Sequence, residues 1–177
     1  MKKIYLGIAL VLLALYAGRF WYVNALFPKE EYISAGMHEV ITNNGLEYSV
    51  ENLELISAEE YAEKYKNADT FDTGVTIAVT TLKVQNASAE EKRTNLLDFV
   101  LTKGSWSNGT DLYALYDMNG DTFDGTIQPG EVQELRIATC VNAEVAKLHA
   151  GKEPWILRLS GWPYRKEFVV SPENAGD

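Results

Sequence analysis

The sequence has a single cysteine, Cys140, among its 177 residues. One thiol cannot form an intrachain disulfide or a multi-cysteine metal site, so the hydrophobic core alone must hold the fold. A folded domain of about 150 residues can bury enough apolar surface for this. Cys140 lies in the apolar run LRIATCV, where we expect a buried and unreactive thiol.

Motifs of common enzymes are also missing. The two histidines, His38 and His149, stand far apart, and no GxSxG, HExxH or SxxK pattern occurs. There is no glycine-rich phosphate loop and no alternation of strands with long helices. The sequence therefore predicts a protein that is not an enzyme. A Ser-His-Asp arrangement stays open, because its members need not be close in sequence.

Positive charge is scarce outside the first 27 residues, which contain Lys2, Lys3 and Arg19 and no acid. Removing those three bases from the 16 in the chain leaves 13 against 25 acids, so residues 28–177 carry a net charge of −12. A body this acidic repels phosphate groups, which argues against a nucleic-acid partner. Solubility is the simplest reason for the charge, and recruitment of cations or of a basic partner is the alternative.

Only the N-terminus contains a long apolar run, from Ile4 to Gly18. It is short for a bilayer span of about 20 residues. In a signal anchor the membrane span would continue past this run, because the Arg19 side chain can reach up to the interface, and Trp21 and Tyr22 would lie at the outer interface. As a signal peptide it would be cleaved near the sequence VNA. We favour the anchor, which predicts a single-pass cell-membrane protein with an extracellular domain. Cleavage would make the protein secreted, and a cytoplasmic core helix is the least favoured alternative.

The longest strand-like stretch is 73–86, TGVTIAVTTLKVQN. Its apolar side chains stand at odd positions up to Val79 and at even positions from Leu82. This change predicts either a bulge near Thr80–Thr81 or a strand that is covered on both faces.

The remaining pattern consists of short strands separated by turn signals. Strands are expected at 38–41, 46–55, 96–102, 112–116, 132–141, 155–159 and 166–170. Asn43-Asn44-Gly45 predicts a hairpin between the first two. A short helix is expected at 57–67, where Ser57 and Glu60 have capping-box spacing, and one helical turn at 142–151. The fold class is therefore all-β, an antiparallel β-sandwich of about seven or eight strands with one short inserted helix, preceded by an N-terminal transmembrane helix.

Three short motifs occur in a characteristic order: Val84-Gln85-Asn86, Phe99-Val100-Leu101, and Ile127-Gln128-Pro129-Gly130-Glu131. In this order the chain resembles bacterial extracellular immunoglobulin-like domains of unknown function, related to the immunoprotective extracellular antigens of mycobacteria. The resemblance covers about residues 38–170 and implies an Ig-like sandwich, a secreted or membrane-anchored location, and no established chemistry. The lipobox cysteine that many such proteins carry is absent here. The expected organisation is an anchor or signal peptide at 1–27, a linker at 28–37, the sandwich at 38–172 and a tail at 173–177.

Exposed aromatic side chains are the main candidates for a binding surface. Trp106 and Trp162 lie in glycine-rich turns, and Tyr113 lies in the irregular stretch between Lys103 and Asp124. Aromatic side chains anchor protein interfaces and form platforms for sugars. We therefore predict binding of a protein or cell-envelope partner at these residues, with packing in the core as the alternative.

A calcium site is the only metal site that the sequence suggests, and no other cofactor is expected. Asp117, Asn119, Asp121 and Asp124 could supply the oxygen ligands that calcium prefers. The EF-hand pattern fails, because the twelfth position from Asp117 is Gln128 and not a bidentate glutamate. The alternative is an Asn-Gly turn with solvated acids. A calcium site would make the protein a structural or adhesive module of the envelope, whereas a turn without calcium fits a simple binding domain.

Overall fold

The computed structural model describes residues 2–27, 30–65, 71–142, 153–161 and 163–173. Its strands are β1 (Glu31–Ala35), β2 (Ile41–Asn43), β3 (Leu46–Ser57), β4 (Thr76–Asn86), β5 (Lys92–Arg93), β6 (Val100–Lys103), β7 (Trp106–Gly109), β8 (Thr126–Ile127), β9 (Val132–Val141), β10 (Trp155–Ser160) and β11 (Tyr164–Val170). Its helices are α1 (Lys2–Leu26), α2 (Ala58–Tyr65), α3 (Leu112–Asn119) and the 3₁₀ helix η1 (Leu96–Asp98).

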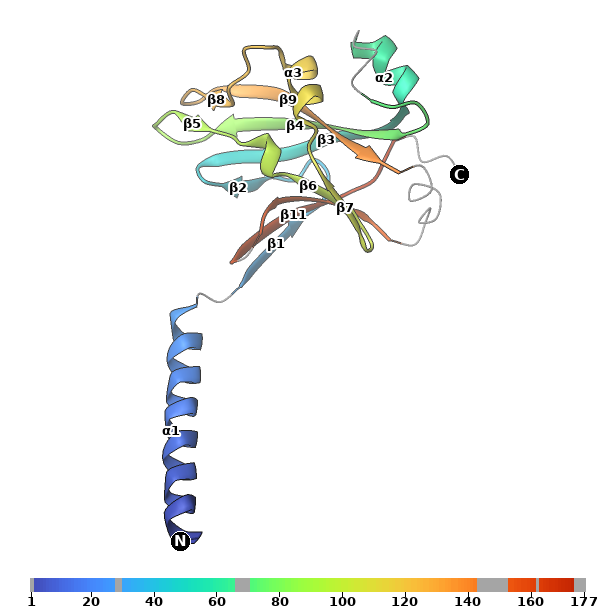
Figure 1. Ribbon diagram of the computed structural model, residues 1–177. Coiled ribbons are helices and arrows are strands. Elements are labelled where there is room, and N and C mark those ends of the chain that lie inside the picture. Colours follow the sequence, from blue (N-terminus) through green and yellow to red (C-terminus); the bar gives the residue numbers. More distant parts are fainter. Residues whose placement is uncertain (1, 28–29, 66–70, 143–152, 162, 174–177) are drawn as a thin grey trace.

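Two sheets face one another and enclose the main core (Figure 1). One sheet has the order β1-β11-β10-β6-β7 and the other β2-β3-β4-β9, while β5 and β8 form a small separate ribbon. Side chains such as Leu82, Leu101 and Phe168 alternate inward from both sheets, as in other sandwiches. The predicted Ig-like β-sandwich is therefore confirmed.

Strand β1 departs from the expected organisation. Residues 31–35 were expected to belong to a linker, but they form an edge strand that pairs in parallel with β11, from Glu31 opposite Tyr164 to Ala35 opposite Phe168. The backbone N–H of Glu31 also donates to Pro163 O at 2.8 Å. Four of the five β1 residues are exposed, so the stretch lacks the buried alternation that reveals a strand in sequence.

Strand β4 is central and regular. It pairs with β9 in an unbroken register from Thr76 to Gln85. Its even positions, such as Leu82, face the core between the sheets, whereas Ile77 and Val79 belong to a second cluster under the helices. The parity change in the sequence therefore reflects a strand covered on both faces. The bulge lies in its partner β3, between Val50 and Asn52.

Helix α2 confirms the predicted helix and covers the outer face of the four-stranded sheet. Its cap is Ser57, whose Oγ accepts from the backbone N–H of Glu60 at 3.1 Å. Tyr61 points inward and is only 1% exposed. Its ring lies 4.8 Å from the ring of Tyr65 and 4.9 Å from that of Phe71. This second cluster explains why β4 is apolar on both faces.

Three of the predicted strands are wrong in whole or in part. The strand expected at 38–41 shares only Ile41 with β2, which spans Ile41–Asn43. The first half of 96–102 is the 3₁₀ helix η1, and only its second half belongs to β6. Residues 112–116, expected to be a strand, begin the helix α3. The helical turn expected at 142–151 lies almost wholly outside the described residues. The sequence thus predicts one short inserted helix, whereas the described residues after α1 contain two α-helices, α2 and α3, and the 3₁₀ helix η1.

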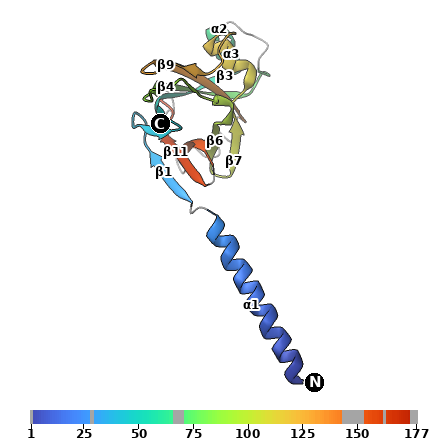
Figure 2. The same cartoon turned by 90° about the vertical axis from the view of Figure 1, so that its left-hand side faces the viewer.

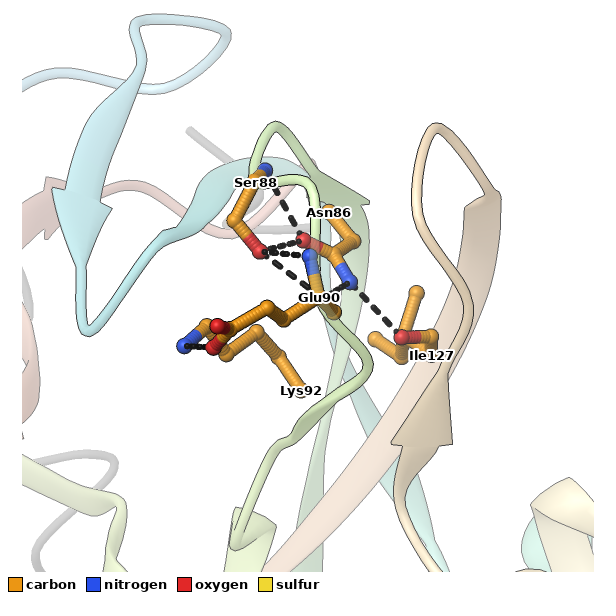
Figure 3. A network of polar contacts seen from close by, with 5 residues as sticks. All are labelled: Asn86, Ser88, Glu90, Lys92 and Ile127. Carbon is orange, nitrogen blue, oxygen red and sulfur yellow. Dashed lines mark hydrogen bonds and ion pairs between the residues drawn. The ribbon is translucent and has the colours of Figure 1, made fainter.

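Asn86 joins two of the motifs that carried the family resemblance (Figure 3). It is fully buried, and its Nδ2 donates to Glu90 O and Ile127 O, each at 2.8 Å. Its Oδ1 accepts from the backbone N–H of Ser88 at 2.9 Å and from the Ser88 hydroxyl at 2.7 Å. Its own carbonyl accepts from Gly130 N at 2.9 Å. The side-chain amide thus ties the end of β4 to the following loop and to β8, and the backbone carbonyl ties it to the Pro-Gly turn.

Helix α1 projects away from the sandwich in both views (Figures 1 and 2). It has 25 residues, or about 38 Å at 1.5 Å per residue. Its segment Tyr5–Leu26 is long and apolar enough to cross a membrane and is not buried against the body. The helix continues through Arg19, so it is longer than the apolar run of the sequence.

Candidate functional site

Helix α3 shapes the most distinctive surface of the domain. Asp111 caps it, because its Oδ1 accepts from the backbone N–H of Ala114 at 3.0 Å. Gly120, with φ of 95°, ends it. Ala114 and Leu115 are buried against the body of the domain. These caps determine where the helix begins and ends, and therefore which of its residues point outward.

The outer side of α3 is apolar. Leu112, Tyr113 and Tyr116 are 44%, 73% and 39% exposed. Their spacing places all three within about 100° of one another around the helix axis. A surface helix normally turns polar residues to solvent, so three large apolar or aromatic side chains on that side indicate a contact surface. We call these three residues the α3 face.

A cleft of about 330 Å³ adjoins the α3 face. Residues 93–97 form one wall, Tyr116 of α3 forms another, and Phe123 and Asp124 close it. Leu97 is 41% exposed at its rim. The lining combines apolar side chains with the polar Arg93 and Asn95. Such a combination suits an extended peptide that inserts an apolar side chain and offers its backbone groups to the polar rim.

The charged groups of the cleft are held in place. The Arg93 Nε donates to the backbone oxygen of Asp124 at 2.6 Å. The backbone N–H of Thr126 donates to Asp124 Oδ1 at 2.9 Å and lowers the pKa of that carboxyl below its usual value. Asp124 therefore remains ionised beside a cation, and the cleft presents both signs of charge.

The predicted aromatic residues are not brought together. Tyr113 is on the α3 face, whereas Trp106 is half-buried in β7 and packs edge-on against Trp155, with ring centroids 5.9 Å apart. The Lys103 ammonium lies 4.6 Å from the Trp155 ring, and burial lowers its pKa. Trp106 thus belongs mainly to the core, which is the alternative to an exposed binding residue. Trp162 lies outside the described residues.

The four calcium candidates also separate. Asn119 Nδ2 donates to Arg136 O at 2.6 Å and its Oδ1 accepts from Arg136 N at 2.8 Å, so its amide pairs with the edge of β9. Asp117 Oδ2 lies 3.5 Å from the Tyr61 hydroxyl, and Asp121 is exposed in the following turn. Across the described residues, no group of three or more His, Cys, Asp or Glu side chains is close enough to hold a metal. Calcium binding therefore stays an untested alternative to the Asn-Gly turn.

The titratable groups near His38 do not form a nucleophilic pair. His38 Nδ1 lies 3.3 Å from Glu51 Oε2, and the Ser49 hydroxyl donates to the other oxygen of the same carboxylate. Ser49 and His38 thus share Glu51 and do not bond to each other. Cys140 is half-buried rather than buried, and desolvation raises the pKa of its thiol, which keeps it protonated at neutral pH. His149 lies outside the described residues.

Sequence reasoning missed most of the cleft. Arg93 and Asn95 were assigned to a polar gap and Leu97 to a strand, because neither the two-residue strand β5, which carries Arg93, nor the 3₁₀ helix η1, which carries Leu97, has a periodic signature. A signal for α3 was present: Asp111 stands in N-cap position and Gly120 in C-cap position around Leu112–Asn119.

Solved structures with a similar fold come from bacteria. An uncharacterised β-sandwich protein from Clostridium difficile has 15% sequence identity and a TM-score of 0.51, over 80% of this chain and 96% of that one. The secreted protein MPT63 from Mycobacterium tuberculosis has 14% identity and a TM-score of 0.52, over 78% of this chain and 98% of that one. At these identities the likeness concerns the fold alone.

No curated protein sequence matches the chain. A family described as a domain of unknown function, DUF5028, matches residues 31–158, which include β1 and end within β10. Neither this family nor either of the two solved structures is described as an enzyme. Because the match covers well over half of the sequence, the chain belongs to the DUF5028 family.

Proposed function

We propose that this protein is a non-enzymatic, membrane-anchored Ig-like domain that binds a protein partner outside the cytoplasmic membrane through the α3 face and the adjoining cleft. The observation that carries the proposal is the α3 face itself: Leu112, Tyr113 and Tyr116 are exposed together on one side of a capped helix. Aromatic side chains in such a position are the commonest anchors of protein interfaces.

A protein partner suits this surface better than a sugar does. A sugar site needs a flat aromatic ring flanked by hydrogen-bonding groups, whereas the α3 face is mainly apolar and lies on a convex helix. The cleft beside it adds a basic group, Arg93, and the acidic Asp124, which match the peptide N–H and C=O groups and the termini of a bound segment. The expected partner therefore presents an apolar anchor beside an extended segment.

The anchored location rests on α1. Its length of about 38 Å exceeds the hydrocarbon core of about 30 Å, so it can span a bilayer and still place Trp21 and Tyr22 near an interface. The fold shared with a secreted mycobacterial protein supports a location outside the cytoplasm. A relation to immunoprotective extracellular antigens is part of the same proposal.

Photo-crosslinking in the native membrane tests the binding surface. The full chain carries p-benzoylphenylalanine in place of Tyr113 in one sample and in place of Val169, which is 39% exposed on β11 of the other sheet, in the second. We expect one defined crosslinked protein from position 113 and none from position 169. Capture of the same protein from both positions, or of none from position 113, would refute the assignment.

A paired variant separates binding from folding. Replacing Leu112 with Ser removes an apolar group that is 44% exposed, so it should change stability by less than about 0.5 kcal/mol. It should nevertheless abolish the crosslink from position 113. If the Leu112→Ser chain melts like the wild type and still gives the crosslink, the α3 face is not the contact surface.

A further inference from the structure

We propose that the end of the sandwich nearest α1 docks on the lipid surface, with a cleft there that receives the ammonium-bearing headgroup of a zwitterionic lipid. The cleft has a volume of about 430 Å³ and lies between the β2–β3 turn, η1 and the β10–β11 turn. The inference rests on the proposed membrane anchoring of α1, and it concerns a different surface from the α3 face.

Chain length keeps this end close to the membrane. Helix α1 ends at Leu26 and β1 begins at Glu31, so five peptide steps separate them and reach at most about 18 Å. The hydrogen bond from Glu31 N to Pro163 O, 2.8 Å long, fixes the β10–β11 turn beside the start of β1. Figures 1 and 2 both show β1 and β11 at the end of the sandwich that faces α1. The cleft therefore cannot lie far from the headgroup layer while α1 is in the bilayer.

The lining suits a small cation better than an anion. Asp98 is the only charged residue of the lining, Asn44 and Ser160 add neutral polar groups, and Asn43 Oδ1 already accepts from the Lys166 Nζ at 3.4 Å. Tyr164, whose side chain is 51% exposed, adds an aromatic ring. A carboxylate and an aromatic ring are the groups that recognise substituted ammonium ions.

The net negative charge of the domain also favours a cationic group over an anionic one. Residues 28–177 carry a net charge of −12, so an anionic headgroup is repelled and an ammonium group is attracted. Exposed tyrosines also fit the interface, because the ring is apolar and the hydroxyl is hydrated. At this end Tyr164, 51% exposed, is such a residue, whereas the Tyr32 hydroxyl donates to Glu167 Oε1 at 2.6 Å and the Arg165 guanidinium lies 5.4 Å from the Tyr32 ring.

Hydrogen–deuterium exchange on the full chain in nanodiscs tests the docking. Discs of phosphatidylethanolamine with phosphatidylglycerol are compared with discs of phosphatidylglycerol alone, following the amides of residues 43–46 and 159–165. We expect exchange in these two turns to slow by about two- to fivefold in the ethanolamine discs, the factor that a surface cation–π contact supplies. Equal exchange in both kinds of disc would overturn the proposal.

Two variants that each remove one negative charge show whether the lipid dependence of exchange arises at this cleft. Asp98→Asn should remove the lipid dependence, whereas Asp121→Asn, at the exposed turn after α3, should keep it. A lipid dependence that survives Asp98→Asn, or is lost in both variants, would overturn the assignment to this cleft. Free phosphoethanolamine added to phosphatidylglycerol discs should not slow exchange. If it slows exchange as much as the lipid does, the ligand is a soluble amine and the docking is wrong.

An intact-mass measurement of the reconstituted chain separates the two proposals. A mass that includes residues 1–27, together with lipid-independent exchange, would refute the docking and leave the anchor intact. A mass that lacks this segment in the native membrane fraction would refute the anchor, and the docking with it.

Discussion

Removal of the Asn86 side chain should strongly destabilise the domain, although Asn86 is a single residue at the junction between β4 and a loop. In the Asn86→Ala chain, the buried carbonyl of Ile127 loses its amide donor, which costs about 1–3 kcal/mol. The two bonds from Ser88 to Asn86 Oδ1 are also lost, at about 0.5–1 kcal/mol each, because Ser88 can turn to water. The sum is about 3 kcal/mol.

The assay is thermal unfolding of the full chain in detergent, followed by tryptophan fluorescence. For a domain of this size, a loss of about 3 kcal/mol lowers the melting temperature by about 6–12 °C. Ser88→Ala, which removes one hydroxyl from the same network, should lose about 1 kcal/mol. Asn95→Ala, an exposed amide at the start of η1, serves as the matched control and should change stability by less than about 0.5 kcal/mol.

Asn86→Asp sharpens the test because it keeps the shape of the side chain. The Nδ2 donor becomes an oxygen that faces the carbonyls of Glu90 and Ile127 at 2.8 Å. At neutral pH this variant should be at least as unstable as Asn86→Ala. If Asn86→Ala and Asn95→Ala melt within 2 °C of each other, a margin of about 1 kcal/mol or less, the side-chain amide does not hold the end of β4 to β8.

Three further outcomes follow from the contacts described above. Asp111→Ala removes the α3 cap and should cost about 1 kcal/mol, measured as a fall of about 2–4 °C in melting temperature. Burial raises the pKa of Tyr48, Tyr61 and Tyr65 above the usual 10.0. As the pH rises above 10, the unfolded chain therefore loses protons first and the free energy of unfolding should fall. Urea unfolding should show this fall, and Tyr61→Phe should reduce it. Millimolar calcium should leave the melting temperature unchanged, because the candidate oxygens of 117–124 are dispersed, and an upward shift would establish the site.

The strands with a clear period of two could be predicted closely from the sequence. The whole of 132–141 forms β9, and the Asn44-Gly45 turn forms the hairpin between β2 and β3. In β9 the buried positions Leu135, Ile137, Thr139 and Val141 follow directly from local alternation. For β4 the sequence allowed two explanations, and only the packing of α2 and α3 on its outer face distinguishes them.

The elements that were mistaken depend on distant contacts. Residues 112–116, LYALY, are apolar at both strand and helix periods, so their conformation is decided by the Asp111 cap and by the edge of β9. Residues 31–35 become a strand only because β11 offers a free edge more than 120 residues later in the chain. No local pattern reveals a partner that is so remote.

The candidate site likewise has one part that could be predicted from local sequence and one part that could not. Tyr113 could be named from the sequence, since an aromatic residue in a polar, glycine-rich stretch has few neighbours to cover it. The cleft beside it could not, because Arg93 and Phe123 approach each other through the β5–β8 ribbon, which pairs Arg93 with Thr126. A site assembled from two loops requires knowledge of how those loops pair.

The edge of β9 explains why α3 can serve as a rigid binding surface. An edge strand carries unpaired backbone groups that invite other strands, and proteins usually cover them. Here Asn119 pairs with both backbone groups of Arg136, and the backbone N–H of Asp111 donates to Ala138 O at 2.8 Å. Both ends of α3 are thus fastened to the sheet by the bonds that close its edge. A helix held at both ends loses little further freedom on binding, so the exposed side chains of the α3 face are already arranged for a partner.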